Sequence, residues 1–530
     1  MKKIKLLDCT LRDGGYINDW DFGLEVIQSL IGSLVKANVD YVELGFLRDC
    51  EYDPNKTLFN NVAEAKKLIP QDSGNTKFTL MALHDKYSIE KLEDNDDTVF
   101  AIRVTFHDYD INEGLDYIAC LMDKGYRVFC NPINIMGYSE RELLDLIEKV
   151  NRIKPHAFSI VDTFGAMRTR DLLKYLLICE SKLDKNIGLG CHLHENMSLA
   201  LSLSETFIKN ISPARDCVID ASLYGMGRVP GNLCIELIAN LINEVNDNEH
   251  YQIDSILEAI DSHITHVKDK SPWGYSPEYF LSAKYNLHRN YAEHFQAKGN
   301  ITFKTIDNLL SEIPENKKTA FDKPFAEQLL AKTFAVDSDN MDKFKSIVLD
   351  DKKILIIAPG LSAVSEKDKI SRFINENNAT VFCVNFVSDI YQNSNVFFGN
   401  ERRFYEYKNM LDNITTKLII SSNISPKNNA IRIDYMKAVD GIAKGTNSVF
   451  MLLNLFYLAG VKEVWLAGVD GYSSDSANYM NKLFENRTVL QNQAEKNDKM
   501  LQNLTRVNKE ISLNFVTSSF YQDYLSGERK

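Results

Sequence analysis

The first half of the chain alternates between short apolar runs and longer stretches with helical periodicity. The apolar runs are rich in β-branched and aromatic residues, as expected for strands buried on both faces: Ile4–Cys9, Asp40–Leu44, Phe78–Ala82, Phe100–Thr105, Arg127–Asn131, Ala157–Val161, Ile187–His192 and Cys217–Ser222. Amphipathic stretches separate most of them, such as Phe22–Ala37, Glu140–Val150, Arg170–Lys182 and Leu199–Asn210. Eight strand–helix alternations predict a (β/α)8 barrel, with an open doubly wound sheet as the alternative.

The strand pattern restarts after the polar stretch Asp337–Lys345. Further strands are predicted at Lys353–Ala358, Thr380–Asn385, Val396–Phe398, Lys417–Ser421, Glu463–Ala467 and Leu513–Thr517. Helical stretches such as Ser448–Leu458 separate several of them, which favours an open α/β sheet of Rossmann type. We therefore predict a barrel domain over residues 1–245 and a Rossmann-like domain over 346–530. A helical extension over 246–345 lies between them, and it either covers the barrel or forms a dimer contact.

Composition narrows the class of protein. The chain has 530 residues, of which 44% are hydrophobic and 25% charged, and a formal net charge of −12, so we expect no nucleic-acid partner. No apolar run reaches membrane-spanning length, and the short run after Met1–Lys3 is unlike a signal peptide. The nine cysteines form no CxxC pair, which indicates reduced thiols. We expect a cytoplasmic homo-oligomer without a membrane partner.

Polar side chains stand where the predicted barrel strands end: Arg12, Asp13, Glu43, Asp162, His192, His194 and Asn232. The carboxyl ends of barrel strands share one mouth, where active sites of this fold lie. Strand alternation places His192 and His194 on the same face, so both can meet Asp13 at one divalent cation. Arg12 adds a fixed positive charge suited to a substrate oxyanion. Taken separately, the Arg–Asp pair reads as a structural ion pair and the HxH segment as incidental.

Five segments in order carry a resemblance to a known family: Leu7–Gly14 (LDCTLRDG), Val42–Leu44 (VEL), Val161–Gly165 (VDTFG), Cys191–Asn196 (CHLHEN) and Gly225–Asn232 (GMGRVPGN). Over about residues 1–300 the chain resembles the DRE-TIM metallolyase superfamily, including its 4-hydroxy-2-oxovalerate aldolase and HMG-CoA lyase branches. It looks most like the aldolase branch, particularly aldolase-like proteins encoded with bacterial surface-polysaccharide enzymes. The segment Ser271–Tyr279 adds to that impression.

The resemblance implies a ligand set and a reaction. Asp13, His192 and His194 would hold Mn2+ or Mg2+, with Co2+ or Zn2+ as other options, and Asn232 contributes to the site in some relatives. The reaction would join or separate a 2-oxo acid and an aldehyde through a pyruvate enolate, in surface-polysaccharide sugar biosynthesis. Glu43 would orient Arg12. The alternatives are an acyl-CoA Claisen-type lyase or synthase, a bifunctional glycan enzyme with a C-terminal glycosyltransferase-like domain, and a binding module with a decayed barrel.

One position departs from the family pattern. Aldolases of the meta-cleavage pathway carry a histidine shortly after the Arg–Asp pair as proton acceptor, and Tyr16 stands at that place here. An unperturbed tyrosine, with a pKa of about 10, is a poor base near neutrality. Three alternatives remain open. A nearby cation lowers the pKa of Tyr16, or His84 or His107 replaces the missing imidazole, or the chemistry differs. Tyr16 is also suited simply to pack against the substrate.

The second domain has a glycine turn after its first strand, Pro359–Ser362, which can present backbone N–H groups to a phosphate. It has neither a GxGxxG motif nor a P-loop. Residues 356–362, 384–386, 445–448 and 464–470 weakly resemble the bacterial sialyltransferase-like Rossmann fold. Gly360, Ser362 and Asn385 are therefore candidates for a nucleotide or nucleotide-sugar site. That family uses a histidine base, but no histidine follows His294; Asp470 or Tyr472 would have to replace it, or the domain is a scaffold.

Overall fold

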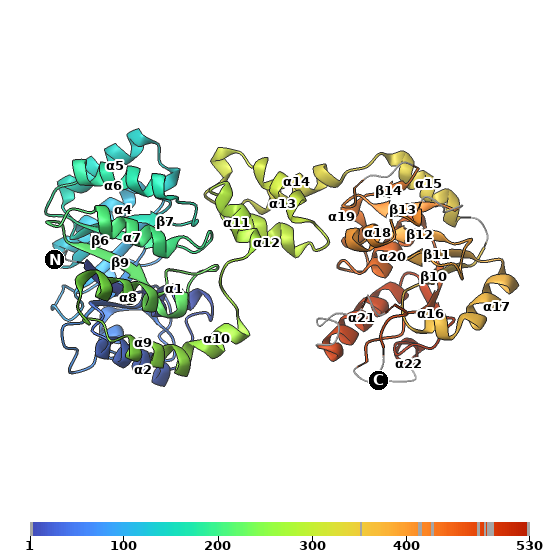
Figure 1. The fold of residues 1–530 in the computed structure, drawn as a ribbon, viewed down its shortest axis with the longest axis horizontal. Coiled ribbons are helices and arrows are strands. Elements are labelled where there is room, and N and C mark those ends of the chain that lie inside the picture. Colours follow the sequence, from blue (N-terminus) through green and yellow to red (C-terminus); the bar gives the residue numbers. More distant parts are fainter. Residues whose placement is uncertain are drawn as a thin grey trace. The chain divides into compact units, whose positions relative to one another are not determined.

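The computed structural model describes residues 4–349, 352–411, 416–425, 429–473, 477–481, 484 and 492–526. The chain forms two compact units, each with its own sheet (Figure 1). Unit 1 comprises Met1–Ala292 and Leu310–Phe321, and unit 2 comprises Glu293–Leu309 and Asp322–Lys530. The domain boundaries expected at residues 245 and 345 stay predictions.

Unit 1 contains a closed barrel of eight parallel strands: β1 (Ile4–Asp8), β2 (Tyr41–Leu47), β4 (Lys77–Ala82), β5 (Ala101–Phe106), β6 (Arg127–Pro132), β7 (Ala157–Asp162), β8 (Gly188–Leu193) and β9 (Cys217–Ala221). The strands are neighbours in the order β1-β9-β8-β7-β6-β5-β4-β2, and β1 pairs with β2 to close the cylinder. A short strand, β3 (Leu58–Phe59), extends the sheet beside β2. The predicted barrel is confirmed, and the open-sheet alternative is wrong.

Helices surround most of the barrel strands: α2 (Leu24–Lys36), α3 (Val62–Lys66), α4 (Ile111–Asp123), α5 (Glu140–Ile153), α6 (Thr169–Lys182), α7 (Ala200–Asn210) and α8 (Ile235–Asn246). Side-chain hydrogen bonds determine where some of these helices begin. At α5, for example, Glu142 N donates to Ser139 Oγ, and Ser139 N donates to Glu142 Oε2. Between β4 and β5 the only helical segment is the short 3-10 turn Ile89–Lys91.

A helical extension follows the barrel, as predicted: α9 (Ile253–Ala259), α10 (Thr265–Lys270), α11 (Pro277–Lys284), α12 (Asn290–Ala297), α13 (Phe303–Ser311), α14 (Lys323–Phe334) and α15 (Ser338–Val348). The stretch Tyr279–Gln296, read from the sequence as one helical patch, is divided between α11 and α12. Asn286 adopts a left-handed backbone conformation, with φ of 53°, between these two helices, and a right-handed helix cannot continue through it.

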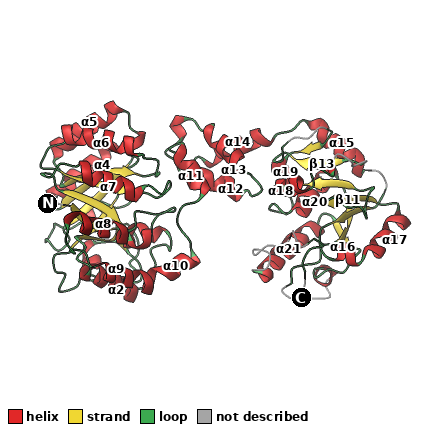
Figure 2. Cartoon of the chain, viewed as in Figure 1, coloured by secondary structure: helices red, strands yellow, loops and turns green. Residues whose placement is uncertain are grey.

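Unit 2 contains an open sheet of seven parallel strands, in the order β14-β13-β12-β11-β10-β15-β16 (Figure 2). The strands are β10 (Ile354–Ile357), β11 (Thr380–Val384), β12 (Asn395–Phe398), β13 (Leu418–Ser421), β14 (Ile431–Ile433), β15 (Glu463–Ala467) and β16 (Ser512–Phe515). This confirms the predicted open α/β sheet. The strand order reverses at β10, where the chain moves from β14 to β15 on the opposite side.

The helices of unit 2 beyond α15 are α16 (Ser362–Ser365), α17 (Lys367–Asn377), α18 (Glu401–Glu406), α19 (Tyr435–Val439), α20 (Ser448–Ala459), α21 (Gln493–Asn508) and α22 (Gln522–Ser526). Ten of the twelve residues of α20 are buried, which explains why this helix is apolar nearly all round. All nine cysteines are free thiols. None of the helices in the described part of the chain has the length and apolarity that crossing a bilayer requires.

Candidate metal centre

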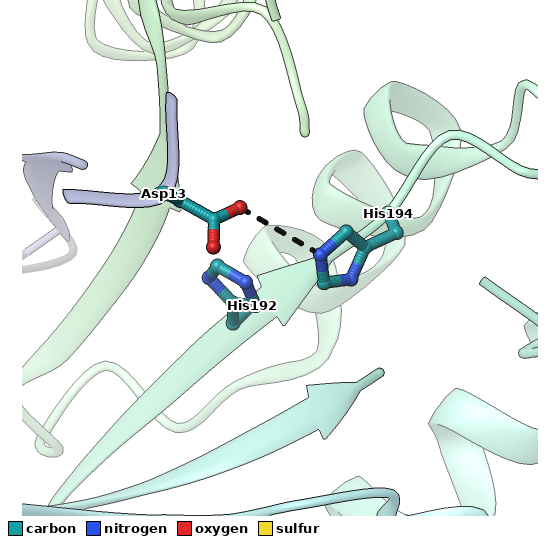
Figure 3. Close-up of side chains that lie close together, drawn as sticks. All are labelled: Asp13, His192 and His194. Carbon is teal, nitrogen blue, oxygen red and sulfur yellow. Dashed lines mark ion pairs between the residues drawn. The ribbon is translucent and has the colours of Figure 1, made fainter. Parts of the chain in front are cut away.

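Three buried side chains converge at the mouth of the barrel: Asp13, His192 and His194 (Figure 3). Asp13 ends α1 (Thr10–Asp13), the helical turn that follows β1, while His192 lies in β8 and His194 directly follows it. One potential ligand atom from each residue lies within 4.8 Å of the others. Residues remote in the sequence therefore form one cluster, as the strand-end argument predicted.

Hydrogen bonds fix how the two imidazoles present their nitrogens. Nδ1 of His194 lies 2.9 Å from the backbone oxygen of Asp162, which can only accept, so Nδ1 carries the proton. Nδ1 of His192 lies 2.9 Å from Oδ2 of Asp220 and donates in the same way. In its neutral form, each ring then carries its lone pair on Nε2, the atom available to a metal.

The protonation states of Asp13 and His192 also favour the binding of a cation. Burial opposes ionisation of Asp13, but the neighbouring charge of Arg12 holds its pKa well below the ordinary value. Burial lowers the pKa of His192, which keeps that ring neutral. The closest approach between carboxylate and imidazole, Asp13 Oδ2 to His194 Nε2, is 3.8 Å. An anion beside two lone pairs is a donor set that a divalent ion satisfies.

The Arg12 guanidinium links Asp13, a member of this cluster, to the carboxylate of Glu43. Its Nη1 donates to Oδ1 of Asp13 at 2.5 Å, and its Nε donates to Oε2 of Glu43 at 2.7 Å. The contact with Glu43 is the one expected of a residue that orients the guanidinium. The remaining nitrogen, Nη2, has no hydrogen-bond acceptor among the described residues, and it can therefore serve a bound ligand.

Two members of the network were missed from the sequence, Arg103 and Asp220. Arg103 is fully buried inside the barrel, where it bonds Glu43 at 3.1 Å and also contacts Asp220. The charged groups thus form a continuous chain that ends at His192. The available signal was a charged side chain within an otherwise apolar strand, because such a residue needs a partner across the barrel.

Asn232 lies against Asp13, donating from Nδ2 to Oδ2 at 2.7 Å. Its Oδ1 is buried and has no hydrogen-bond partner in the described part of the chain. Space here is tight: a Cβ on Gly227 would lie 2.3 Å from Asn232 Nδ2 and 2.8 Å from Asp13 Oδ2. An orphaned oxygen beside the three ligand groups fits a metal site, and the ligand role of Asn232 stays a prediction.

The predicted proton acceptors lie elsewhere at the mouth. Tyr16 is 42% exposed and packs edge-on against Trp20, with ring centroids 4.8 Å apart. Nε2 of His84 lies 2.9 Å from Oδ2 of Asp110, whose other oxygen accepts a hydrogen bond from the His107 backbone at 2.5 Å. Among the described residues, no side-chain hydrogen bond, ion pair or ring contact joins Tyr16 or His84 to Asp13, His192 or His194.

A narrow pocket beside His194 is lined in part by Arg228. Nη2 of Arg228 donates to Nε2 of His288 at 2.8 Å. Burial, together with the charge of Arg228, lowers the pKa of His288 to about 3, so the imidazole is neutral. No ion pair joins Arg228 to a carboxylate in the part of the chain that the structure describes, which leaves its positive charge available to a ligand.

The nucleotide-site candidates all belong to unit 2. Gly360 and Asn385 line one cavity. Ser362 instead bonds Asp470, with its backbone N–H 2.8 Å from Oδ2 and its hydroxyl on Oδ1. Two of the three candidates therefore share one site, while Ser362 orients an acid that also lines it.

Comparisons with known proteins agree with the barrel geometry. The model of the HMGL-like family matches residues 100–263. A 4-hydroxy-2-oxovalerate aldolase of Geobacillus genomosp. 3 is 22% identical over 265 residues, covering 48% of this chain and 75% of that protein. An oxaloacetate decarboxylase of Mycobacterium tuberculosis is 19% identical over 296 residues, covering 55% of this chain and 85% of that protein.

Among solved structures, the HMG-CoA lyase of Brucella melitensis is 14% identical with a TM-score of 0.40, covering 49% of this chain and 96% of that one. Within the N-terminal half of the chain, residues 100–263 are therefore HMGL-like by the family model, and 4-hydroxy-2-oxovalerate aldolases are distant relatives of this half. The resemblance of the second domain to sialyltransferases stays a prediction.

Proposed function

We propose that the barrel is a divalent-metal-dependent aldolase that forms or breaks the carbon–carbon bond between C3 and C4 of a 4-hydroxy-2-oxo acid, through a pyruvate enolate. The observation that carries this proposal is the convergence of Asp13, His192 and His194 with both imidazoles held in the metal-binding tautomer. The HMGL-like match supports the same class of reaction. A role in surface-polysaccharide synthesis remains a prediction from the sequence.

Asp13, His192 and His194 would hold the ion, with Mn2+ or Mg2+ as the expected metals. A bound divalent ion supplies Lewis acidity that favours negative charge on the keto oxygen. Arg12 contributes independently, because Nη2 can donate to the same oxygen while Nε and Nη1 hold the guanidinium in place. Because the carboxylates of Glu43 and Asp13 both pair with the Arg12 guanidinium, its position is fixed before the substrate binds.

We propose His84 as the proton acceptor from the substrate hydroxyl. Asp110 fixes the imidazole from one side, in the manner of a base that is oriented by a carboxylate. Tyr16 has no hydrogen-bond partner for its hydroxyl among the described residues, and its ring is engaged with aromatic neighbours. Tyr16 then shapes the entrance rather than moving a proton.

Arg228 provides a place for an anionic group of the substrate. It lines the pocket that His194 also lines, and its guanidinium rests on a neutral imidazole rather than on a carboxylate. A carboxylate paired with Arg228 would be held near the metal ligands.

The proposal is tested by solvent-deuterium exchange into the methyl group of pyruvate, followed by NMR with and without added Mn2+, and then by a screen of aldehydes. We expect exchange that requires Mn2+ and disappears with chelator. Asp13→Asn is expected to abolish it, and Asp145→Asn, on the exposed face of α5, serves as the matched control.

Exchange that is indifferent to chelator would remove the metal from the mechanism. Release of free CoA from an acyl-CoA, without aldehyde chemistry, would replace the aldolase with a Claisen-type reaction.

A further inference from the structure

Unit 2 contains a cavity of about 260 Å³ that the barrel chemistry does not use. It opens at the carboxyl ends of the central strands, where Gly360 follows β10, Asn385 follows β11 and Gly468 follows β15. These are the strands around the reversal of strand order. Open parallel α/β sheets bind their ligands in the crevice at this point.

One wall of the cavity is the beginning of α20, where Thr446, Asn447, Ser448 and Val449 all line it. Asn447 caps the helix by accepting a hydrogen bond from Val449 N at 2.9 Å. The first turn of this twelve-residue helix contains no acidic residue, so no side chain of that turn offsets the positive end of the helix dipole. This wall of the cavity therefore favours the binding of an anion.

Arg403, from α18, adds a full positive charge to the same cavity. Its guanidinium lies 3.9 Å from the centre of the Phe484 ring, and Nη1 donates to Glu406 at 2.7 Å. Its side chain is 17% exposed, in contrast to 74% for Arg402, the preceding residue. The neighbouring arginine on the same helix thus provides a natural comparison.

The remaining wall is aromatic and is formed in part by Tyr472, Tyr479 and Phe484. The rings of Tyr479 and Phe484 meet edge to face, with centroids 6.0 Å apart. Asp470 is the one acid among the described residues that line the cavity; burial raises its pKa, and Ser362 donates two hydrogen bonds to it. The cavity therefore combines a positive, donor-rich end with flat apolar surface on which a ring can stack.

We propose that this cavity binds a nucleoside phosphate, with the phosphate at the N-terminus of α20 and near Arg403, and the base against the aromatic wall. An uncharged sugar or an apolar ligand would leave the positive end of α20 without an anion. This site is independent of the barrel and of its proposed activity.

Calorimetry on the full chain tests the proposal, with CMP, UMP, GMP and AMP as probes, followed by the matching nucleosides and inorganic phosphate. We expect at least one nucleoside monophosphate to bind, and its parent nucleoside to bind about tenfold more weakly or worse, because the phosphate contacts are lost. Failure of all four nucleotides to bind at millimolar concentration would overturn the proposal. Equal binding of nucleoside and nucleotide would also overturn it.

Asn447→Asp is the sharpest variant, because aspartate caps a helix as well as asparagine but places a negative charge where the phosphate is expected. We expect binding to fall about tenfold or more while the melting temperature holds. Asn447→Ser keeps a neutral cap and should bind like the wild type. An Asn447→Asp protein that binds nucleotide unchanged would refute the phosphate position.

Arg403→Ala provides a second, independent variant, with Arg402→Ala as its matched control on the same helix. We expect only Arg403→Ala to weaken nucleotide binding, and equal behaviour of the two would contradict the site. Asp13→Asn should bind nucleotide like the wild type, so failure of the barrel proposal and failure of this one are distinguishable.

Discussion

The barrel mouth and the cavity of unit 2 are built from different kinds of polar group. At the mouth, ionised side chains are buried together and linked from Asp13 through Arg12 and Glu43 to Arg103 and Asp220. In unit 2, the lining consists mainly of amides, hydroxyls, aromatic rings and a helix end. Both sites lie at the carboxyl ends of parallel strands, so the fold decides where a site is, and the side chains decide what it holds.

The difference has a physical basis. A cation site must present acceptors, and buried acceptors stay fixed only when neighbouring charges and hydrogen-bond donors hold them. A ligand that carries its own charge is satisfied by dipoles and one guanidinium, which need no such network. We therefore expect substitution of a metal-ligand residue at the barrel mouth to cost far more activity than a substitution in unit 2 costs binding.

The largest loss is expected for Asp13→Asn, and also for His194→Ala, because each removes a ligand atom from the buried cluster. We expect kcat/KM with a 2-oxo acid and aldehyde to fall about a thousandfold or more. Metal titration and circular dichroism separate lost binding from lost folding. Full activity in either variant would show that the cluster is not the metal centre.

Arg12→Lys is expected to lower kcat by about a hundredfold to a thousandfold. A lysine ammonium cannot bond Asp13, Glu43 and a substrate oxygen with the geometry of a guanidinium. Steady-state kinetics at saturating metal check this, since the ligand atoms themselves remain. Turnover close to that of the wild type would contradict a role for Arg12 at the substrate oxygen.

His84→Asn is expected to lower kcat for aldol cleavage by about a hundredfold, as loss of a general base does. Tyr16→Phe should change kcat by less than about threefold, because its ring contacts are kept. Both rates are measured beside pyruvate methyl exchange, which the proposed step at the substrate hydroxyl does not govern. The reverse ranking would make Tyr16 the base.

Asp220→Asn tests whether a residue that is not itself a metal ligand changes the affinity of the site for the metal. The hydrogen bond to His192 Nδ1 would weaken and Arg103 would lose its charged partner, so we expect Mn2+ affinity to fall about tenfold to a hundredfold. Calorimetric titration with Mn2+ measures the change, and thermal melting reports the structural cost. An unchanged affinity would confine Asp220 to a structural role.

A smaller effect than loss of a metal ligand is expected for Arg228→Gln, which removes a charge but keeps a donor. KM for the 2-oxo acid should rise about tenfold with little change in kcat, because the proposed contact with Arg228 would hold the anionic group equally in the ground state and in the transition state. A variant that changes kcat and leaves KM constant would place Arg228 in the chemistry instead.

The sequence was sufficient for the parts of the site that depend on strand ends. Asp13, His192 and His194 follow or end strands whose apolar runs are clear, so their convergence followed from the barrel itself. Arg103 and Asp220 were missed, because they lie within strands and their partners are set by the barrel's closure rather than by any local pattern. The tautomers of the two histidines likewise depend on contacts that only the three-dimensional structure supplies.

The same limit appears in unit 2. Strand β14 has only three residues, too few for a periodic signal, and it was not predicted. Gly360 and Asn385 could be placed from the turns that follow their strands, and Asn447 belongs to the segment 445–448 that the resemblance marked. Arg403, in contrast, reaches the cavity from a helix that no motif marked. Sequence patterns therefore identify elements and their ends better than they identify which distant elements share a cavity.

The closure of the barrel is uneven: β1 is in register with β9 over five residue pairs but with β2 over only two, Leu7–Tyr41 and Asp8–Val42. Just above this short seam, the Arg12–Glu43 ion pair joins the same two parts of the chain. Arg12 therefore also links the two ends of this short seam of the cylinder. An ion bound to Asp13 would strengthen that link, so backbone amides along the seam should exchange with solvent more slowly when the metal is bound.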